Sequence, residues 1–118
     1  MKTHKDLDIW KKGIGLVTDI YNLSKNFPKE EMYGLSAQMR RAAISYPSNV
    51  AEGAARSSTT EYIRFIYIAL GSLSEVETQV IIVKNLGYVS DIENLLKEIE
   101  ILRKMTLNFI KFLKKVNE

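Results

Sequence analysis

Polar side chains recur along one edge of the segment between residues 30 and 56, at a spacing that suits either charge pairing or ligand binding. This edge consists of Arg41, Ser45, Asn49, Glu52 and Arg56, at successive intervals of four, four, three and four residues. Residues at such intervals share one face of an α-helix. The following segment has a similar edge, made of Glu61, Ile68, Ser72, Glu75 and Gln79. Two polar edges of this kind can meet as a polar seam between adjacent antiparallel helices.

Two interpretations of the polar seam stay open. In the first, Arg41 or Arg40 is buried in an ion pair. Its partner would be Glu75 or Glu52, and such a pair fixes the register of the helices more than it adds stability. In the second, the seam is a groove that takes a ligand or RNA.

Catalytic chemistry finds little support among the residue types. The sequence has no Cys, and its single His, His4, lies ahead of the first predicted helix. This excludes cysteine nucleophiles, thiolate metal sites, His-based triads and the Glu-x-x-His pairs of di-metal bundles. Glu75 and Glu77 point about 200° apart around a helix and so cannot converge on one metal. We expect no enzyme activity, no metal, no cofactor and no small-molecule substrate.

The charge balance is mildly basic. The 17 Lys and Arg residues exceed the 14 Asp and Glu residues, for a formal charge of +3. Lysines load the end of the last predicted helix and acidic residues its start, which complements the helix dipole and needs no nucleic acid. Repeated around an oligomer, however, the same excess would build a positive face. The predicted contacts with nucleic-acid phosphates are Arg40, Arg41, Arg56 and Lys114.

Four helices must position these residues. Apolar residues at intervals of three and four predict helices over residues 7–26, 30–54, 58–86 and from residue 90 onward. Ser58 and Ser90 begin capping boxes, Gly87 suits a left-handed helix end, and Pro47 is expected to kink the second helix. Short turns make successive helices antiparallel. The whole chain, residues 1–118, is therefore predicted to be one all-α domain, an up-and-down antiparallel four-helix bundle.

The third predicted helix is apolar or aromatic nearly all round between residues 62 and 70. A bundle helix normally keeps a polar side for water, and large exposed apolar patches mark interfaces. Charged residues such as Arg64 and Glu75 interrupt the segment, so we expect no membrane span. We favour a homo-oligomer joined through this helix over complete enclosure by the other three. The candidate interface residues are Tyr62, Phe65, Ile66, Tyr67 and Leu70.

The second predicted helix resembles the signature of the bacterial four-helix-bundle family named after the 23S ribosomal RNA intervening-sequence protein, over residues 38–53 (QMRRAAISYPSNVAEG). Further matches are Phe27, Pro28, Glu31, Tyr33, Gly34, Leu35 and residues 71–79 (GSLSEVETQ). The family motif residues present are Gln38, Arg40, Arg41, Ser45, Asn49, Glu52, Gly53, Gly71, Ser72, Glu75 and Glu77. The resemblance implies a bundle that assembles into a ring, typically a homopentamer.

The chain is also similar to the accessory variability protein of diversity-generating retroelements, a basic pentamer that binds RNA and a reverse transcriptase. This similarity implies RNA or a nucleoprotein as the partner. We therefore expect a non-enzymatic, homo-oligomeric, RNA-associated bundle. The alternative is a protein-interaction or structural scaffold that binds no nucleic acid. The polar N-terminal residues lack a signal-peptide pattern, which predicts a cytoplasmic protein.

Overall fold

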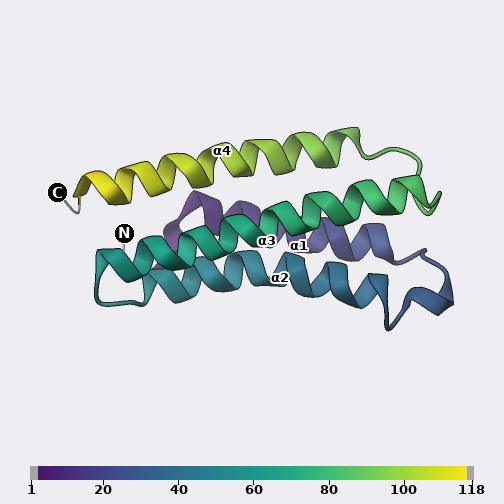
Figure 1. Ribbon diagram of the computed structural model, residues 1–118, viewed down its shortest axis with the longest axis horizontal. Coiled ribbons are helices and arrows are strands. Elements are labelled where there is room, and N and C mark those ends of the chain that lie inside the picture. The colour runs from purple at the N-terminus through teal and green to yellow at the C-terminus, as the bar shows by residue number, and fades with distance from the viewer. Residues whose placement is uncertain (1–2, 117–118) are drawn as a thin grey trace.

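Successive helices of the chain run antiparallel in the computed structural model, which describes residues 3–116 (Figure 1). The helices are α1 (Asp8–Ser24), α2 (Leu35–Ala54), α3 (Thr59–Asn85) and α4 (Glu93–Val116), with short 3-10 turns at η1 (His4–Asp6) and η2 (Lys29–Glu31). The bundle measures 49 × 24 × 19 Å. The all-α prediction is confirmed, because residues 3–116 contain four α-helices and no strand.

One apolar core runs the length of the bundle and receives side chains from every helix. Its fully buried members include Ile20, Met39, Tyr46, Leu73 and Ile99. Among the four pairs of neighbouring helices, the contact between α2 and α3 is the most extensive and that between α1 and α4 is the least extensive. Long, closely packed neighbours of this kind draw most of their stability from the apolar faces they bury.

The second helix begins five residues later than predicted, at Leu35. Residues before it form the turn η2, and the Glu31 carboxylate accepts a hydrogen bond from the Leu35 N–H at 3.4 Å. From there α2 continues as one helix through Pro47 to Ala54, as the unbroken apolar register predicts. Pro47 is buried beside Gly13 of α1, where a Cβ atom would lie 2.7 Å from the Tyr46 ring. Glycine therefore allows α1 and α2 to approach closely.

The ends of α3 follow the predicted capping chemistry. The Ser58 hydroxyl accepts the Glu61 N–H at 3.1 Å. At the other end Gly87 has φ of +80°, and its N–H donates to the Lys84 carbonyl at 2.9 Å. The following N–H, that of Tyr88, donates to the Val83 carbonyl at 3.0 Å. These two bonds satisfy carbonyls that the helix itself leaves open.

The start of α4 differs from the prediction. Its first turn is capped by Asp91, whose carboxylate accepts the Glu93 N–H at 3.1 Å. The predicted acceptor, Ser90, is exposed one residue earlier. Asp and Ser are comparably good caps, so the residue types alone could not predict which of these two neighbours caps α4.

The prediction that the apolar part of α3 forms an interface needs one correction. Ile66 is completely buried in the core with Ala69 and Leu73, at the inward spacing of three and seven residues, so it cannot contact a second copy. Tyr62, Phe65 and Leu70 are half-buried, and Tyr67 is exposed. Because every position from residue 65 to residue 70 is apolar, the sequence did not reveal which side faces inward.

By length and composition α3 could cross a membrane, since its most apolar window has a mean hydropathy of 1.4. In the bundle it packs against both α2 and α4, and 44% of that window is buried among them. Its apolar residues thus have a structural role in the core of the bundle.

Candidate nucleic-acid interface

The centre of the predicted polar seam forms as a hydrogen-bonded cluster between α2 and α3. The Ser72 hydroxyl donates to Ser45 Oγ at 3.0 Å. The Asn49 amide donates to the same Oγ at 3.0 Å and to the Ser45 carbonyl at 2.8 Å. These bonds satisfy polar groups at the edge of the core and join α2 to α3.

The predicted ion pair of Arg41 with Glu75 or Glu52 is wrong within one chain. Arg41 and Glu75 are exposed, and neither has a hydrogen-bond or ion-pair partner among residues 3–116. Glu52 instead pairs with Arg56 on its own helix, at 2.8 Å. Each four-residue step turns a helix about 40° past a full turn. The edge therefore drifts by about 80° between Arg41 and Asn49, so that Asn49 meets α3 while Arg41 faces water.

The other seam arginine, Arg40, points to α1 and not to α3. Its Nε donates to Ser24 Oγ at 2.8 Å, and its guanidinium lies 4.5 Å from the centre of the Tyr21 ring. Ser24 in turn donates to the Ile20 carbonyl at 2.8 Å. Arg40 thus joins α1 to α2 and is turned away from the seam with α3.

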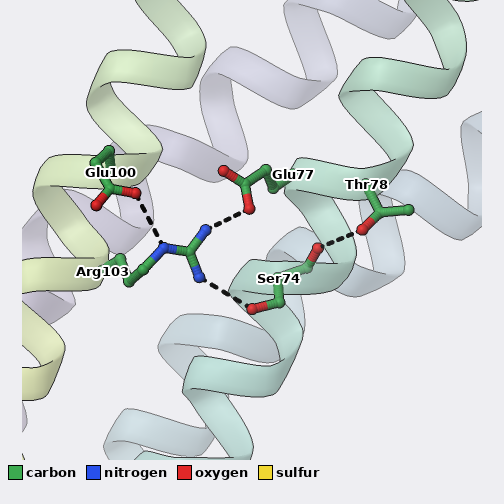
Figure 2. Close-up of polar contacts among 5 residues, drawn as sticks. All are labelled: Ser74, Glu77, Thr78, Glu100 and Arg103. Atoms are coloured by element: carbon green, nitrogen blue, oxygen red, sulfur yellow. Dashed lines mark hydrogen bonds and ion pairs between the residues drawn. The ribbon is translucent and has the colours of Figure 1, made fainter.

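A charged network between α3 and α4 was not predicted, although it includes the motif residue Glu77 (Figure 2). Arg103 Nε donates to Glu100 at 3.1 Å, and Nη1 donates to Ser74 Oγ at 3.0 Å. Nη2 donates to Glu77. Burial opposes the charge of Arg103, but the bonds to both carboxylates and their charges outweigh it and raise its pKa. The signal for Arg103 was the acidic residue three positions before it, which is a common helix pair.

A basic groove lies between the first half of α3 and the second half of α4, with a volume of about 460 Å³. It is lined by Tyr67, Lys104, Leu107, Asn108, Ile110, Lys111 and Lys114. The Lys114 ammonium donates to the Tyr67 hydroxyl at 3.0 Å and lies 5.4 Å from the centre of its ring. The lining has three positive side chains and no negative one. We name this feature the α3–α4 groove.

The lysines of the α3–α4 groove are available to a ligand. All three are exposed, and none forms an ion pair with a carboxylate in the described part of the chain. A groove between α1 and α4, of about 430 Å³, has the opposite charge, with Asp19, Asp91 and Glu98 in its lining. There the pKa of Asp19 is raised by burial and by the charge of Glu98. An anion would thus favour the α3–α4 groove over this one.

The four predicted phosphate contacts do not form one site. Lys114 and Arg56 lie at the end of the bundle where α2 turns into α3 and α4 finishes, whereas Arg40 and Arg41 are near the start of α2 (Figure 1). Arg56 is engaged with Glu52 and lies 4.6 Å from the centre of the Phe65 ring. Of the four, only Lys114 lines the α3–α4 groove. Within residues 3–116, no three His, Asp or Glu side chains gather as a metal site.

Residues 5–108 match the family of 23S rRNA-intervening sequence proteins. The chain belongs to this family. The match extends from η1 through most of α4, so it includes the seam, the Arg103 network and Lys104 of the α3–α4 groove. Lys111 and Lys114 lie beyond it.

A solved structure supports the fold of this 23S rRNA-intervening sequence family member. It is a protein of unknown function from the S23 ribosomal protein family of Bacteroides thetaiotaomicron VPI-5482. The two share 18% sequence identity, the match covers 93% of this chain and 98% of that chain, and the TM-score is 0.62. No curated protein matches the sequence. The likeness shows a shared helical fold between two proteins of low sequence identity.

Proposed function

We propose that this 23S rRNA-intervening sequence family member is a non-enzymatic, cytoplasmic module that binds RNA, or RNA within a nucleoprotein, as a homo-oligomer. The observation that supports RNA binding is the α3–α4 groove, in which Lys104, Lys111 and Lys114 face solvent and no acidic residue is part of the lining. Unpaired lysines neutralise phosphates and release counterions, which gives affinity for nucleic acid with little sequence preference.

Self-association is supported by the outer surface of α2 and α3. Ile44 is 42% exposed and Ile68 is 40% exposed. On the same two helices Arg41 and Glu75 are also exposed, and neither has a partner among residues 3–116. Exposed apolar side chains together with unpaired charges of both signs are typical of a surface that binds a second copy of the same chain. We name this surface, which also includes Gly71, the outer α2–α3 face. A pentamer, which the family resemblance implies, would multiply the charge of each chain by five.

Binding of a fluorescein-labelled structured RNA, followed by anisotropy at low and moderate salt, tests the RNA part. The charge variant is the triple substitution Lys104→Gln, Lys111→Gln and Lys114→Gln. Its matched control replaces the exposed lysines Lys11, Lys25 and Lys29 with Gln. Each lost phosphate contact should lower the slope of log affinity against log salt by roughly 0.7–0.9. The groove triple should therefore lose roughly 2–3 in slope and the control almost nothing. Equal losses in both variants would contradict the site.

The second candidate function is a protein-interaction scaffold without nucleic acid, and the outer α2–α3 face favours it. Light-scattering chromatography, with and without RNA, separates the two functions. An oligomer that retains RNA at low salt supports the RNA-binding module. An oligomer that never retains RNA supports the scaffold, and a monomer at all concentrations contradicts self-association in both.

A further inference from the structure

Tyr67 differs from the tyrosines whose rings pack against a phenylalanine ring. It is 45% exposed, and within residues 3–116 its hydroxyl and ring have one polar partner, the Lys114 ammonium. Tyr62, by contrast, packs against the Phe109 ring with centres 5.5 Å apart. The Lys114 side chain that lies over the ring of Tyr67 is flexible, and the groove that they share is also lined by the buried core residue Ile110. A planar ligand can replace that ammonium without disturbing the core.

The lysines of the α3–α4 groove are spread along the helix beside this ring. Lys104 and Lys114 are ten residues apart, which corresponds to about 15 Å along α4. Lys111 lies between them, seven residues from the first. A track of separated positive charges that ends at an aromatic ring suits a chain of phosphates with a base attached near one end. A single compact anion could reach no more than part of it.

The ring decides between single-stranded and double-stranded RNA. In a duplex the bases are stacked on one another, and the deep, narrow major groove keeps side chains from their faces. An unpaired base, in contrast, can be turned outward and laid on an aromatic side chain. Proteins that bind single strands without sequence preference combine a positive track with such rings.

We infer that the α3–α4 groove binds single-stranded RNA, with one base stacked on Tyr67 in place of Lys114 and the phosphates on Lys104 and Lys111. This inference rests on the proposed RNA binding and adds the class of RNA and the residue that selects it. The displaced Lys114 ammonium remains close enough to join the phosphate track, because its stem is long and flexible.

The test uses two fluorescein-labelled RNAs: a single strand of 12 nucleotides and a hairpin whose stem has 12 base pairs. Their binding is compared by anisotropy at one fixed salt concentration. Tyr67→Leu removes the ring and Tyr67→Phe keeps it while removing the hydroxyl. The matched control is Tyr21→Leu, since Tyr21 is also exposed (39%) and also lies against a cation, Arg40 at 4.5 Å. Stacking on one base is expected to make Tyr67→Leu weaken single-strand binding by roughly 5- to 100-fold. Tyr67→Phe and Tyr21→Leu should stay within about 2-fold of the wild type.

The outcomes separate this inference from the proposed function. If neither RNA binds the wild-type protein, both fail. If RNA binds and the groove lysines are needed, but Tyr67→Leu behaves as Tyr21→Leu does, RNA binding stands and base stacking fails. Equal affinity for the hairpin and the single strand would also overturn the inference. Thermal unfolding of each variant verifies that the substitution has not unfolded the bundle.

Discussion

The Tyr46 hydroxyl of α2 lies 2.7 Å from Thr106 Oγ1 of α4, and both side chains are completely buried. Thr106 has one hydroxyl proton, which it donates to the Leu102 carbonyl at 2.7 Å. Tyr46 must therefore be the donor and Thr106 the acceptor. This bond crosses the core between two helices that are not neighbours in the bundle. It fixes the rotation of α4 against α2 where apolar contacts alone would tolerate several arrangements.

The two partners of this bond are expected to respond unequally to substitution. Tyr46→Phe removes the donor and leaves Thr106 bonded to Leu102, so the free energy of unfolding should fall by about 1 kcal/mol. Thr106→Val leaves the Tyr46 hydroxyl buried without an acceptor, and the free energy of unfolding should fall by about 1–3 kcal/mol. Urea unfolding of both variants and of the double variant measures this. The double variant should be more stable than Thr106→Val alone, because it contains no orphaned hydroxyl, and a less stable double variant would contradict the donor assignment.

Burial of Tyr46 also predicts an alkaline transition. Burial is the main cause: it raises the pKa of the Tyr46 hydroxyl to about 12 from 10.0. Since the folded pKa lies above the unfolded one, the unfolded state loses its proton first. The stabilisation is complete below pH 10 and is lost as the pH rises towards 12. The free energy of unfolding should fall by about 2–3 kcal/mol over this range.

Comparison with Tyr46→Phe isolates this group from Tyr62 and Tyr88, whose pKa values are also raised. Below pH 10 the wild type should be the more stable protein. Its advantage should shrink above pH 10 and vanish near about pH 11. Urea unfolding at several pH values measures this, and an advantage that stays constant up to pH 12 would contradict the raised pKa.

The helices of this protein could be predicted from local signals, and the contacts between them could not. Ser58 and Gly87 act at the ends of α3 as their residue types predict, because capping involves only the adjacent turn. The pairing of Arg103 with Glu77 depends on how α4 is rotated against α3, which is set by packing across the whole core. In the same way, the packing of α2 against α3 decides that Arg41 is exposed. Polar residues on a helix edge thus indicate that a seam exists, but tertiary packing decides which of them meet.

The α3–α4 groove was likewise only partly visible in the sequence. Lys114 was predicted to contact phosphate, and Tyr67 was predicted to contact a second copy. Their hydrogen bond, between residues 47 positions apart, places both in one groove. The lysines Lys104 and Lys111 were attributed to the helix dipole, an effect that falls off within the last turn. Lys104 lies three turns from the end of α4, beyond the reach of that effect.

The Arg103 network is expected to stabilise the bundle more than any exposed arginine does. The Arg103 side chain is 21% exposed and that of Glu77 is 32% exposed, so solvent screens this pair only in part. Arg103→Met keeps the apolar stem and removes the charge-assisted bonds, and should lower the free energy of unfolding by about 1.5–3 kcal/mol. Arg103→Lys should recover little, since one ammonium cannot reproduce the planar fork that reaches Ser74, Glu77 and Glu100.

The control for this prediction is Arg41→Met, made on an exposed arginine with no partner among residues 3–116. It should change the free energy of unfolding by less than about 0.5 kcal/mol at protein concentrations where the chain is monomeric. Urea unfolding followed by circular dichroism compares the two variants. Equal losses for Arg103→Met and Arg41→Met would show that the network adds nothing beyond an ordinary surface charge.

Two motif glycines are expected to respond in opposite directions to alanine. A Cβ atom at Gly53 would lie 3.0 Å from Phe65 Cβ and 3.2 Å from the Tyr62 carbonyl oxygen, so α2 and α3 would have to separate. Gly53→Ala should therefore destabilise the chain by about 1–3 kcal/mol, despite the better helix propensity of alanine.

A Cβ atom at Gly71 meets nothing within 4 Å, and the same holds for Gly15 on α1. Both alanine variants should stabilise a single chain by about 0.5–1 kcal/mol, because alanine loses less backbone entropy in a helix. Gly71 differs in lying on the outer α2–α3 face. If two copies approach closely there, Gly71→Ala weakens self-association while Gly15→Ala does not, as light-scattering chromatography over a dilution series would report. Unchanged association in Gly71→Ala would exclude a close approach of helices at that point, because an added methyl group cannot fit between closely packed backbones without moving them.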